Sequence, residues 1–133
     1  MRSELPHLSE QGFDGLVGLE YLELSDGFAA GRAQVREELK QPGGLVHGGV
    51  YASIAESLAS IATHVAVMSE RKIATGLSNQ TSFLRPITEG TIHAAARARH
   101  RGRTTWVWEV EFEDDQGRLC VLTRMTVAVR DAP

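Results

Sequence analysis

The fold of this chain is decided by one stretch, QPGGLVHGG at residues 41–49, which runs directly into VYASIAESLASIATHVAVM at residues 50–68. The first part is a glycine-rich loop that carries a glutamine and a histidine. The second part is an apolar segment long enough for about five helical turns, and Glu56 is its only charged residue. Because a carboxylate costs free energy when it leaves water, its place in the most hydrophobic helix of a small protein needs a functional reason.

The helix predicted over residues 50–68 has two unlike faces when its residues are spaced at about 100°. The bulky residues opposite Glu56 are Ile54, Leu58, Ile61 and Val65. The small residues around Glu56 are Gly49, Ala52, Ser53, Ala59, Ser60 and Thr63. We expect the bulky face to be buried and the small face to meet a ligand or a second subunit.

The remainder of the chain favours strands. Segments in which apolar and polar residues alternate, or in which apolar residues dominate, predict strands at residues 19–24, 28–35, 73–84, 91–101, 105–113 and 118–130. The pattern is clearest where Trp106 and Trp108 alternate with glutamates, and Gly31 is a candidate bulge. One helix for five to six strands, without a repeating strand–helix–strand pattern, predicts an α+β domain in which an antiparallel sheet wraps around one long central helix.

Length and charge limit the function classes. The 133 residues predict a single domain over 1–133, with residues 1–14 as a loosely attached N-terminal segment. A net charge of -3 does not favour nucleic-acid binding. No signal sequence is apparent and Glu56 interrupts the longest apolar run, so we expect a cytoplasmic protein without a membrane partner. The single Cys120 and the scattered histidines predict no metal site.

Two features of the long helix suggest chemistry. The free N–H groups at its start, near His47 and Gly48, would stabilise a developing oxyanion. Burial of Glu56 would raise its pKa toward that of a general base, and Ser53, Ser60 and Thr63 could hold a water beside it. The ordinary structural alternatives are a charge at the helix rim, satisfied by a neighbouring chain, and a Gly-Gly start that only caps the helix, preceded by a structural histidine.

One basic run, RARHRGR at residues 97–103, could grip phosphates. A solvated strand edge and turn explain it equally well. Trp106 and Trp108 could stack on a ring, but their alternation favours core positions. The sequence contains no Gly-x-Ser-x-Gly elbow, so a serine-hydrolase triad is not expected.

Four motifs together resemble a known family: GLVHGG at residues 44–49, AES at 55–57, SFLRP at 82–86 and DQGRLC at 115–120. The chain resembles hotdog-fold acyl-CoA thioesterases over about residues 15–130. The most similar branch is the glutamate type, with 4-hydroxybenzoyl-CoA and 1,4-dihydroxy-2-naphthoyl-CoA thioesterases, which is related to phenylacetate-pathway enzymes. The related phenylacetate-type enzymes carry Asp at the position of Glu56, which favours the glutamate branch.

The resemblance implies a role for each matching residue. Glu56 would be the catalytic carboxylate, as nucleophile or general base, and the Gly48 N–H would bind the oxyanion. His47 and Gln41 would position the thioester, and Ser60 would position water. The region implied to meet the CoA phosphates is Arg101, Gly102, Arg103 and Thr104. No cofactor is implied, since CoA is part of the substrate, and the family forms dimers or dimers of dimers with sites between subunits.

Three functions follow from these residues. The first is hydrolysis of an acyl-CoA to a free acid and CoA, with an aromatic or medium-sized acyl group. The second is hydration or dehydration of a 3-hydroxyacyl thioester, although the expected histidine loop of that class has no match here. The third is a non-catalytic acyl-CoA-binding module, against which the trio Gln41, His47 and Glu56 argues.

Overall fold

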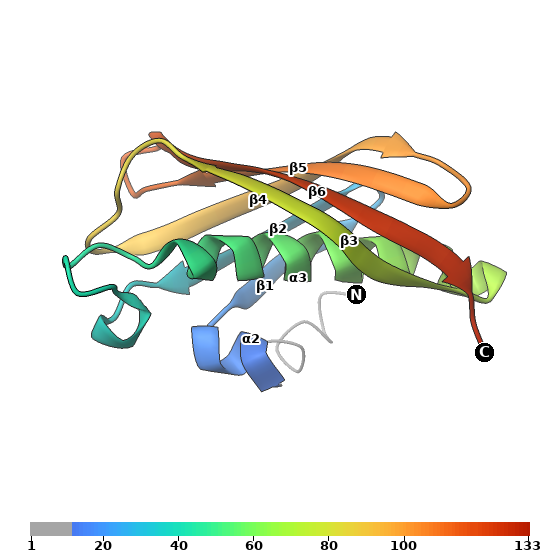
Figure 1. Cartoon of the computed structure of the whole chain (residues 1–133), viewed down its shortest axis with the longest axis horizontal. Coiled ribbons are helices and arrows are strands. Elements are labelled where there is room, and N and C mark those ends of the chain that lie inside the picture. The colour runs from blue at the N-terminus through green and yellow to red at the C-terminus, as the bar shows by residue number, and fades with distance from the viewer. Residues whose placement is uncertain (1–11) are drawn as a thin grey trace.

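The computed structural model describes residues 12–133 as one helix inside a curved sheet (Figure 1). The helical elements are α2 (Gly12–Val17), the short 3-10 turn η2 (Glu37–Leu39), α3 (Gly48–Val67) and the 3-10 turn η3 (Met68–Glu70). The strands are β1 (Glu20–Ser25), β2 (Phe28–Gln34), β3 (Lys72–Phe83), β4 (Thr91–Arg101), β5 (Thr105–Glu113) and β6 (Leu119–Asp131).

All six strands form one antiparallel sheet in the order β1-β2-β4-β5-β6-β3. The sheet curves over α3 on one side, and α2 lies on the other side of the helix (Figure 1). This is the hotdog arrangement that the sequence predicts. Strands β1 and β3 are the two edges, and β3 pairs only with β6 among the described strands.

The core lies between α3 and the concave face of the sheet. Ile54 and Leu58 are buried on the helix, and Trp108 and Phe112 are fully buried on β5. The Trp108 indole Nε1 donates a hydrogen bond of 2.8 Å to Thr63 Oγ1 of the helix. Ile54, Leu58 and the two tryptophans are therefore core, as predicted. Ile61 and Val65, on the same helix face, are only half-buried.

Two local predictions need correction. The long helix begins at Gly48, two residues before the predicted start. His47 caps it, because its side chain accepts a hydrogen bond from the Gly49 N–H. The bulge expected at Gly31 lies instead on β1, between Tyr21 and Glu23. Gly31 serves close packing, since a Cβ there would lie 2.9 Å from the carbonyl oxygen of Glu20 and 3.3 Å from Leu58 on the helix.

The N-terminal segment predicted as loosely attached falls mostly outside the described residues, which exclude 1–11. At its end, the Asp14 carboxylate accepts hydrogen bonds of 2.6 Å from the Tyr21 hydroxyl and 2.6 Å from the Ser57 hydroxyl. Burial, followed by these contacts with Asp14, raises the pKa of Tyr21. Helix α2 is thus fastened to both β1 and α3.

The central helix with its extension, Gly48–Glu70, is also long and apolar enough to cross a membrane by length and composition alone. Core helices of globular domains meet the same criterion. Here the apolar face of the helix is covered by the sheet (Figure 1).

Candidate active site

The loop before α3 is a tight turn held at both ends. The Gln41 N–H donates to the Leu45 carbonyl at 2.9 Å, and Gly44 adopts a φ of 89°, which favours glycine. Beyond the turn, the Val46 N–H donates to the Ile87 carbonyl at 2.9 Å, and the His47 N–H donates to the Leu39 carbonyl at 2.8 Å. These bonds fix the chain at the entrance to the helix.

The start of α3 leaves one amide free. The His47 Nδ1 atom accepts a hydrogen bond of 2.9 Å from the Gly49 N–H, and the His47 carbonyl accepts one of 3.0 Å from the Val50 N–H. Among residues 12–133, the Gly48 N–H has no hydrogen-bond partner. It sits at the positive end of a 20-residue helix, so it is suited to bind a carbonyl oxygen that gains negative charge.

Glu56 lies two turns further along the helix, against strand β3. A Cβ on Gly76 would lie 3.1 Å from Glu56 Oε1, so this mid-strand glycine is what lets the carboxylate approach the sheet. Strand β3 is irregular next to this point, between Gly76 and Ser78. Bulges of this kind are common beside active sites.

Glu56 is exposed in the single chain, on the helix face that the sequence predicts to meet a ligand or a second subunit. The physical reason is that Glu56 lies against β3, the edge strand of the described sheet, whereas Ala59 and Thr63 of the same small face are buried. Within the described part of the chain, Glu56 makes no hydrogen bond or ion pair. Its carboxylate is therefore available to a water or a substrate.

The hydroxyls expected around Glu56 have different surroundings. The prediction that Thr63 holds a water beside Glu56 is wrong, because Thr63 is fully buried, accepts from Trp108 and donates to the Ala59 carbonyl at 2.7 Å. Ser53 donates to the Gly49 carbonyl at 2.7 Å. Ser60 faces a hollow that is also lined by His64 and by Ala74 of β3. It is the hydroxyl that remains free to position water.

The predicted trio does not converge on one point in a single chain. Gln41 and Gly48 line a groove that is bounded by Phe83 and the end of β3. His47 lines a different hollow, between α2 and the start of α3. Glu56, eight residues after Gly48, lies about 12 Å further along the helix axis. One chain thus presents these residues at separate places along the helix.

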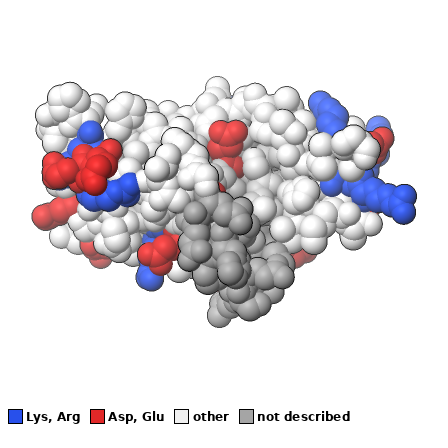
Figure 2. All heavy atoms as spheres, turned by 90° about the horizontal axis from the view of Figure 1, so that it is seen from below, with Lys and Arg blue, Asp and Glu red and all other residues white. Residues whose placement is uncertain are grey.

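The predicted CoA-binding residues lie at the other end of α3. Arg101, Gly102 and Arg103 line a hollow together with Lys72. In Figure 2, Lys and Arg side chains gather at the end of the molecule where Figure 1 places the β4–β5 turn and η3. Thr104 is exposed in the same turn.

Most cations of the basic run already have partners. Arg101 forms an ion pair of 2.6 Å with Asp26 and lies over the Trp106 ring at 5.3 Å. Arg97 lies over the Phe28 ring, and Arg99 is 3.8 Å from Glu109. Arg103 has no hydrogen bond or ion pair with the residues that the structure describes. It is the cation most available to a phosphate.

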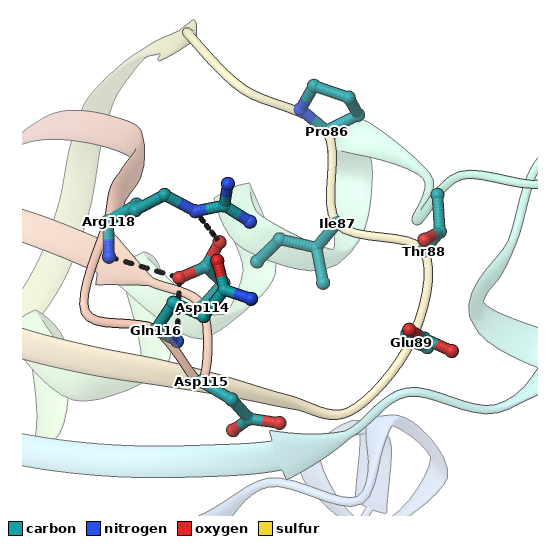
Figure 3. A pocket seen from close by; sticks show the side chains of 8 residues that line it. All are labelled: Pro86, Ile87, Thr88, Glu89, Asp114, Asp115, Gln116 and Arg118. Atoms are coloured by element: carbon teal, nitrogen blue, oxygen red, sulfur yellow. Dashed lines mark hydrogen bonds and ion pairs between the residues drawn. The ribbon is translucent and has the colours of Figure 1, made fainter.

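A further hollow beside the β5–β6 turn is lined by three carboxylates, of which Asp114 and Asp115 are already bonded (Figure 3). The Asp114 carboxylate accepts from the Gln116 N–H at 3.0 Å and from the Arg118 N–H and Nε at 3.0 and 2.7 Å. Asp115 is bonded to His93 at 2.8 Å. No group of three or more potential metal ligands occurs among residues 12–133. The Asp114 hydrogen bonds therefore stabilise the β5–β6 turn.

Two contacts near the site were not assigned from the sequence. Phe83 packs its ring against Gly48, so a Cβ on that glycine would lie 2.7 Å from Phe83 Cζ. Gly76 makes room for Glu56. A glycine in the middle of a predicted strand signals such an approach, but which helix residue would fill the space depends on a contact between segments distant in sequence.

Comparison with known proteins places this geometry in a family. The thioesterase superfamily matches residues 43–121, which include Gly48, Glu56 and Phe83. The chain is 30% identical to the 1,4-dihydroxy-2-naphthoyl-CoA hydrolase of Escherichia coli over 122 residues, which cover 92% of this chain and 89% of that protein. It is 33% identical to the Listeria monocytogenes protein of the same name over 119 residues, which cover 90% and 96%.

Solved structures agree with the sequence matches. A variant of a thioesterase from Pseudomonas aeruginosa superposes with a TM-score of 0.91 at 31% identity, covering 97% of this chain and 93% of that chain. A thioesterase from Haemophilus influenzae also gives a TM-score of 0.91, at 27% identity, with coverage of 98% and 91%.

Proposed function

The chain belongs to the thioesterase superfamily and is a thioester hydrolase, and from this premise we propose that it cleaves acyl-CoA with Glu56 as the catalytic carboxylate and the Gly48 amide as the oxyanion donor. The acyl group is aromatic or of medium size. The observation that carries the proposal is the free Gly48 N–H at the start of α3, which His47 leaves open by capping Gly49.

The reaction follows from these two groups. Glu56 takes a proton from a water whose oxygen attacks the thioester carbonyl carbon. The carbonyl oxygen becomes an oxyanion and accepts the hydrogen bond from the Gly48 N–H. When the tetrahedral intermediate collapses, the C–S bond breaks, and the CoA thiolate recovers the proton from Glu56. A direct attack by the Glu56 carboxylate, with a mixed anhydride hydrolysed afterwards, uses the same geometry.

The distance between the two groups favours a site shared between subunits. Eight residues of helix separate Gly48 from Glu56 by about 12 Å along the axis, whereas reacting atoms must come within about 3–3.5 Å. We infer that one carbonyl meets the Gly48 amide of one chain and the Glu56 carboxylate of another. A second subunit that brings its own Glu56 to this Gly48 resolves the difference.

The edge strand β3 is the proposed contact between subunits. Its outer edge pairs with no other strand in the described part of the chain, and Leu77 on it is a large exposed hydrophobic residue. Unpaired edges associate readily with other strands. Because Glu56 lies against this strand at Gly76, pairing there would bring a second helix close to the carboxylate, in a dimer or a dimer of dimers.

The remaining predicted residues fit around this centre. Gln41 lines the same groove as Gly48, and His47 lines a hollow with Gly49; both would position the thioester. Ser60, one helical turn after Glu56, would hold the water. The hollow at Arg101, Gly102 and Arg103 would take the CoA phosphates, with Thr104 beside them. Arg103 is the principal cation in that role, since Arg101 is held by Asp26.

The test is release of CoA from benzoyl-CoA and hexanoyl-CoA, followed with a thiol reagent. We expect Glu56→Gln to lose at least about 100-fold in kcat, the scale of a lost general base. The matched control is Glu113→Gln, which removes an exposed carboxylate on β5 and should leave the rate unchanged. Full activity of Glu56→Gln would remove Glu56 from the mechanism. Loss of crotonyl-CoA absorbance without free thiol would point to a hydratase.

A further inference from the structure

The groove at the start of α3 has an aromatic wall whose role is not explained by the hydrolytic step. The groove has a volume of about 500 Å³ and contains two residues of the proposed site, Gln41 and Gly48. Its other walls include Tyr51, Phe83, Leu84 and Val121. A thioester whose carbonyl oxygen is bound at Gly48 therefore has apolar and aromatic side chains on the side of its acyl group.

Phe83 is the wall residue nearest to the oxyanion donor. Its ring atoms Cζ and Cε1 would lie 2.7 and 2.9 Å from a Cβ on Gly48, a separation that real Cβ atoms do not tolerate. The ring thus rests directly on the first residue of the helix. A carbonyl oxygen about 3 Å from the Gly48 nitrogen brings the first atoms of the acyl group within contact distance of this ring.

Tyr51 forms a fixed wall behind Phe83. Its ring centroid lies 6.2 Å from that of Phe83 and 5.4 Å from that of the fully buried Phe112, in an edge-on arrangement. Burial raises the pKa of Tyr51 to about 12, so the phenol stays neutral at pH 7. Phe83, in contrast, is 59% exposed. It can adapt to a ligand, and it can be replaced without opening the core.

We propose that this groove binds the acyl group and that Phe83 selects flat aromatic acyl groups over aliphatic ones of similar size. This inference rests on the proposed function, because it takes the Gly48 amide as the point where the carbonyl binds. An aryl group beside Gly48 would meet the Phe83 and Tyr51 rings at the separations of 4.5–7 Å that aromatic pairs favour. An alkyl chain fills the same space without that ring–ring interaction.

The experiment measures binding of two thioethers that cannot be hydrolysed, S-phenacyl-CoA and S-(2-oxoheptyl)-CoA, by isothermal titration calorimetry. Both carry a carbonyl for the Gly48 amide. The ratio of their dissociation constants reports the aryl preference. We expect Phe83→Leu, which keeps apolar bulk without a ring, and Phe83→Ala to reduce the preference for the phenacyl ligand by about tenfold, the scale of a lost aromatic pair.

The control is Leu22→Ala, which truncates an exposed apolar residue on the opposite edge strand β1 and should leave the ratio unchanged. A ratio that stays within about twofold of wild type in both Phe83 variants would overturn the inference. Turnover of benzoyl-CoA by the wild-type protein is measured in parallel. Its absence, together with a shifted ratio, would remove the proposed hydrolysis and leave the acyl groove in place.

Discussion

Gly48 combines two properties at the scale of a single residue. It lacks a side chain, which lets the Phe83 ring rest on the helix start, and its N–H has no partner among residues 12–133. Substitutions can separate these properties. Alanine adds a Cβ and keeps the N–H, whereas proline adds a Cβ and removes the N–H.

The first prediction compares Gly48→Pro with Gly48→Ala. Proline suits the first position of a helix, and His47 has the extended conformation that a following proline requires, with φ -63° and ψ 135°. Both variants add a Cβ that meets the Phe83 ring. We expect Gly48→Pro to lose about 10²–10³-fold in kcat, as for removal of an oxyanion donor, and Gly48→Ala to lose far less. Equal losses in steady-state hydrolysis would mean that the amide is not the donor.

At single residues, the sequence predicts identity and spacing but not burial. The pattern around residues 41–56 identifies Gly48 and Glu56, because glycines at a helix start and a lone carboxylate on a small face are visible without a structure. It does not give the exposure of Glu56 or the burial of Thr63. Those depend on which strand packs against each side of the helix, and that choice is made by contacts between distant segments.

At the scale of the elements, a buried hydrogen bond joins helix α3 to strand β5 of the sheet. The Trp108 indole N–H and the Thr63 hydroxyl are fully buried and bonded at 2.8 Å. We predict that Thr63→Val lowers the free energy of unfolding by about 1–3 kcal/mol, because the indole N–H is left buried without a partner. Urea unfolding monitored by fluorescence measures the change.

A double-mutant cycle provides the control for this contact. Trp108→Phe removes the donor, so the effect of Thr63→Val should be smaller in that background than in the wild type. An effect of equal size in both backgrounds would show that the loss comes from the helix alone, not from the bond to β5.

The Asp114 carboxylate, in the turn between β5 and β6, is expected to make the stability of the protein depend on pH. The backbone N–H of Arg118, followed by its guanidinium and the Gln116 N–H, holds the pKa of Asp114 below its ordinary value. A group with a lowered pKa in the folded state contributes stability above its unfolded pKa of about 3.9 and loses it as the pH falls through the folded pKa.

We therefore expect Asp114→Asn to be less stable than the wild type at pH 7, with the difference shrinking as the pH falls below about 4. Thermal unfolding between pH 2.5 and 7 tests this, with Glu113→Gln as the neighbouring control. A difference that stays constant over the range would contradict the assigned role of the Asp114 carboxylate.

The elements themselves were largely predictable. The strands at residues 91–101 and 105–113 match β4 and β5, and the other strand boundaries differ by one residue. Local alternation and turns encode these features. The strand order is not local, because β3 pairs with β6 across more than 35 residues of intervening chain, including β4 and β5. That pairing makes β3 an edge and leaves the Glu56 side of the helix uncovered.

On the scale of the whole molecule, one chain holds the two proposed catalytic residues apart. The backbones of Gly48 and Glu56 are separated by about 12 Å along α3. The free edge of β3, next to Gly76 and Glu56, offers the surface on which a second copy would correct this. We therefore propose that hydrolysis requires the assembled homo-oligomer.

The most direct test is the activity of a purified mixed dimer in which one subunit carries Glu56→Gln and the other carries Gly48→Pro. Two different affinity tags allow the mixed form to be isolated, and CoA release is measured with a thiol reagent. A shared site gives one centre with both lesions and one centre with neither, so we predict about half of the wild-type rate. If each site lies within one subunit, both centres are damaged. A rate no higher than that of the two parent variants would contradict a site shared between subunits.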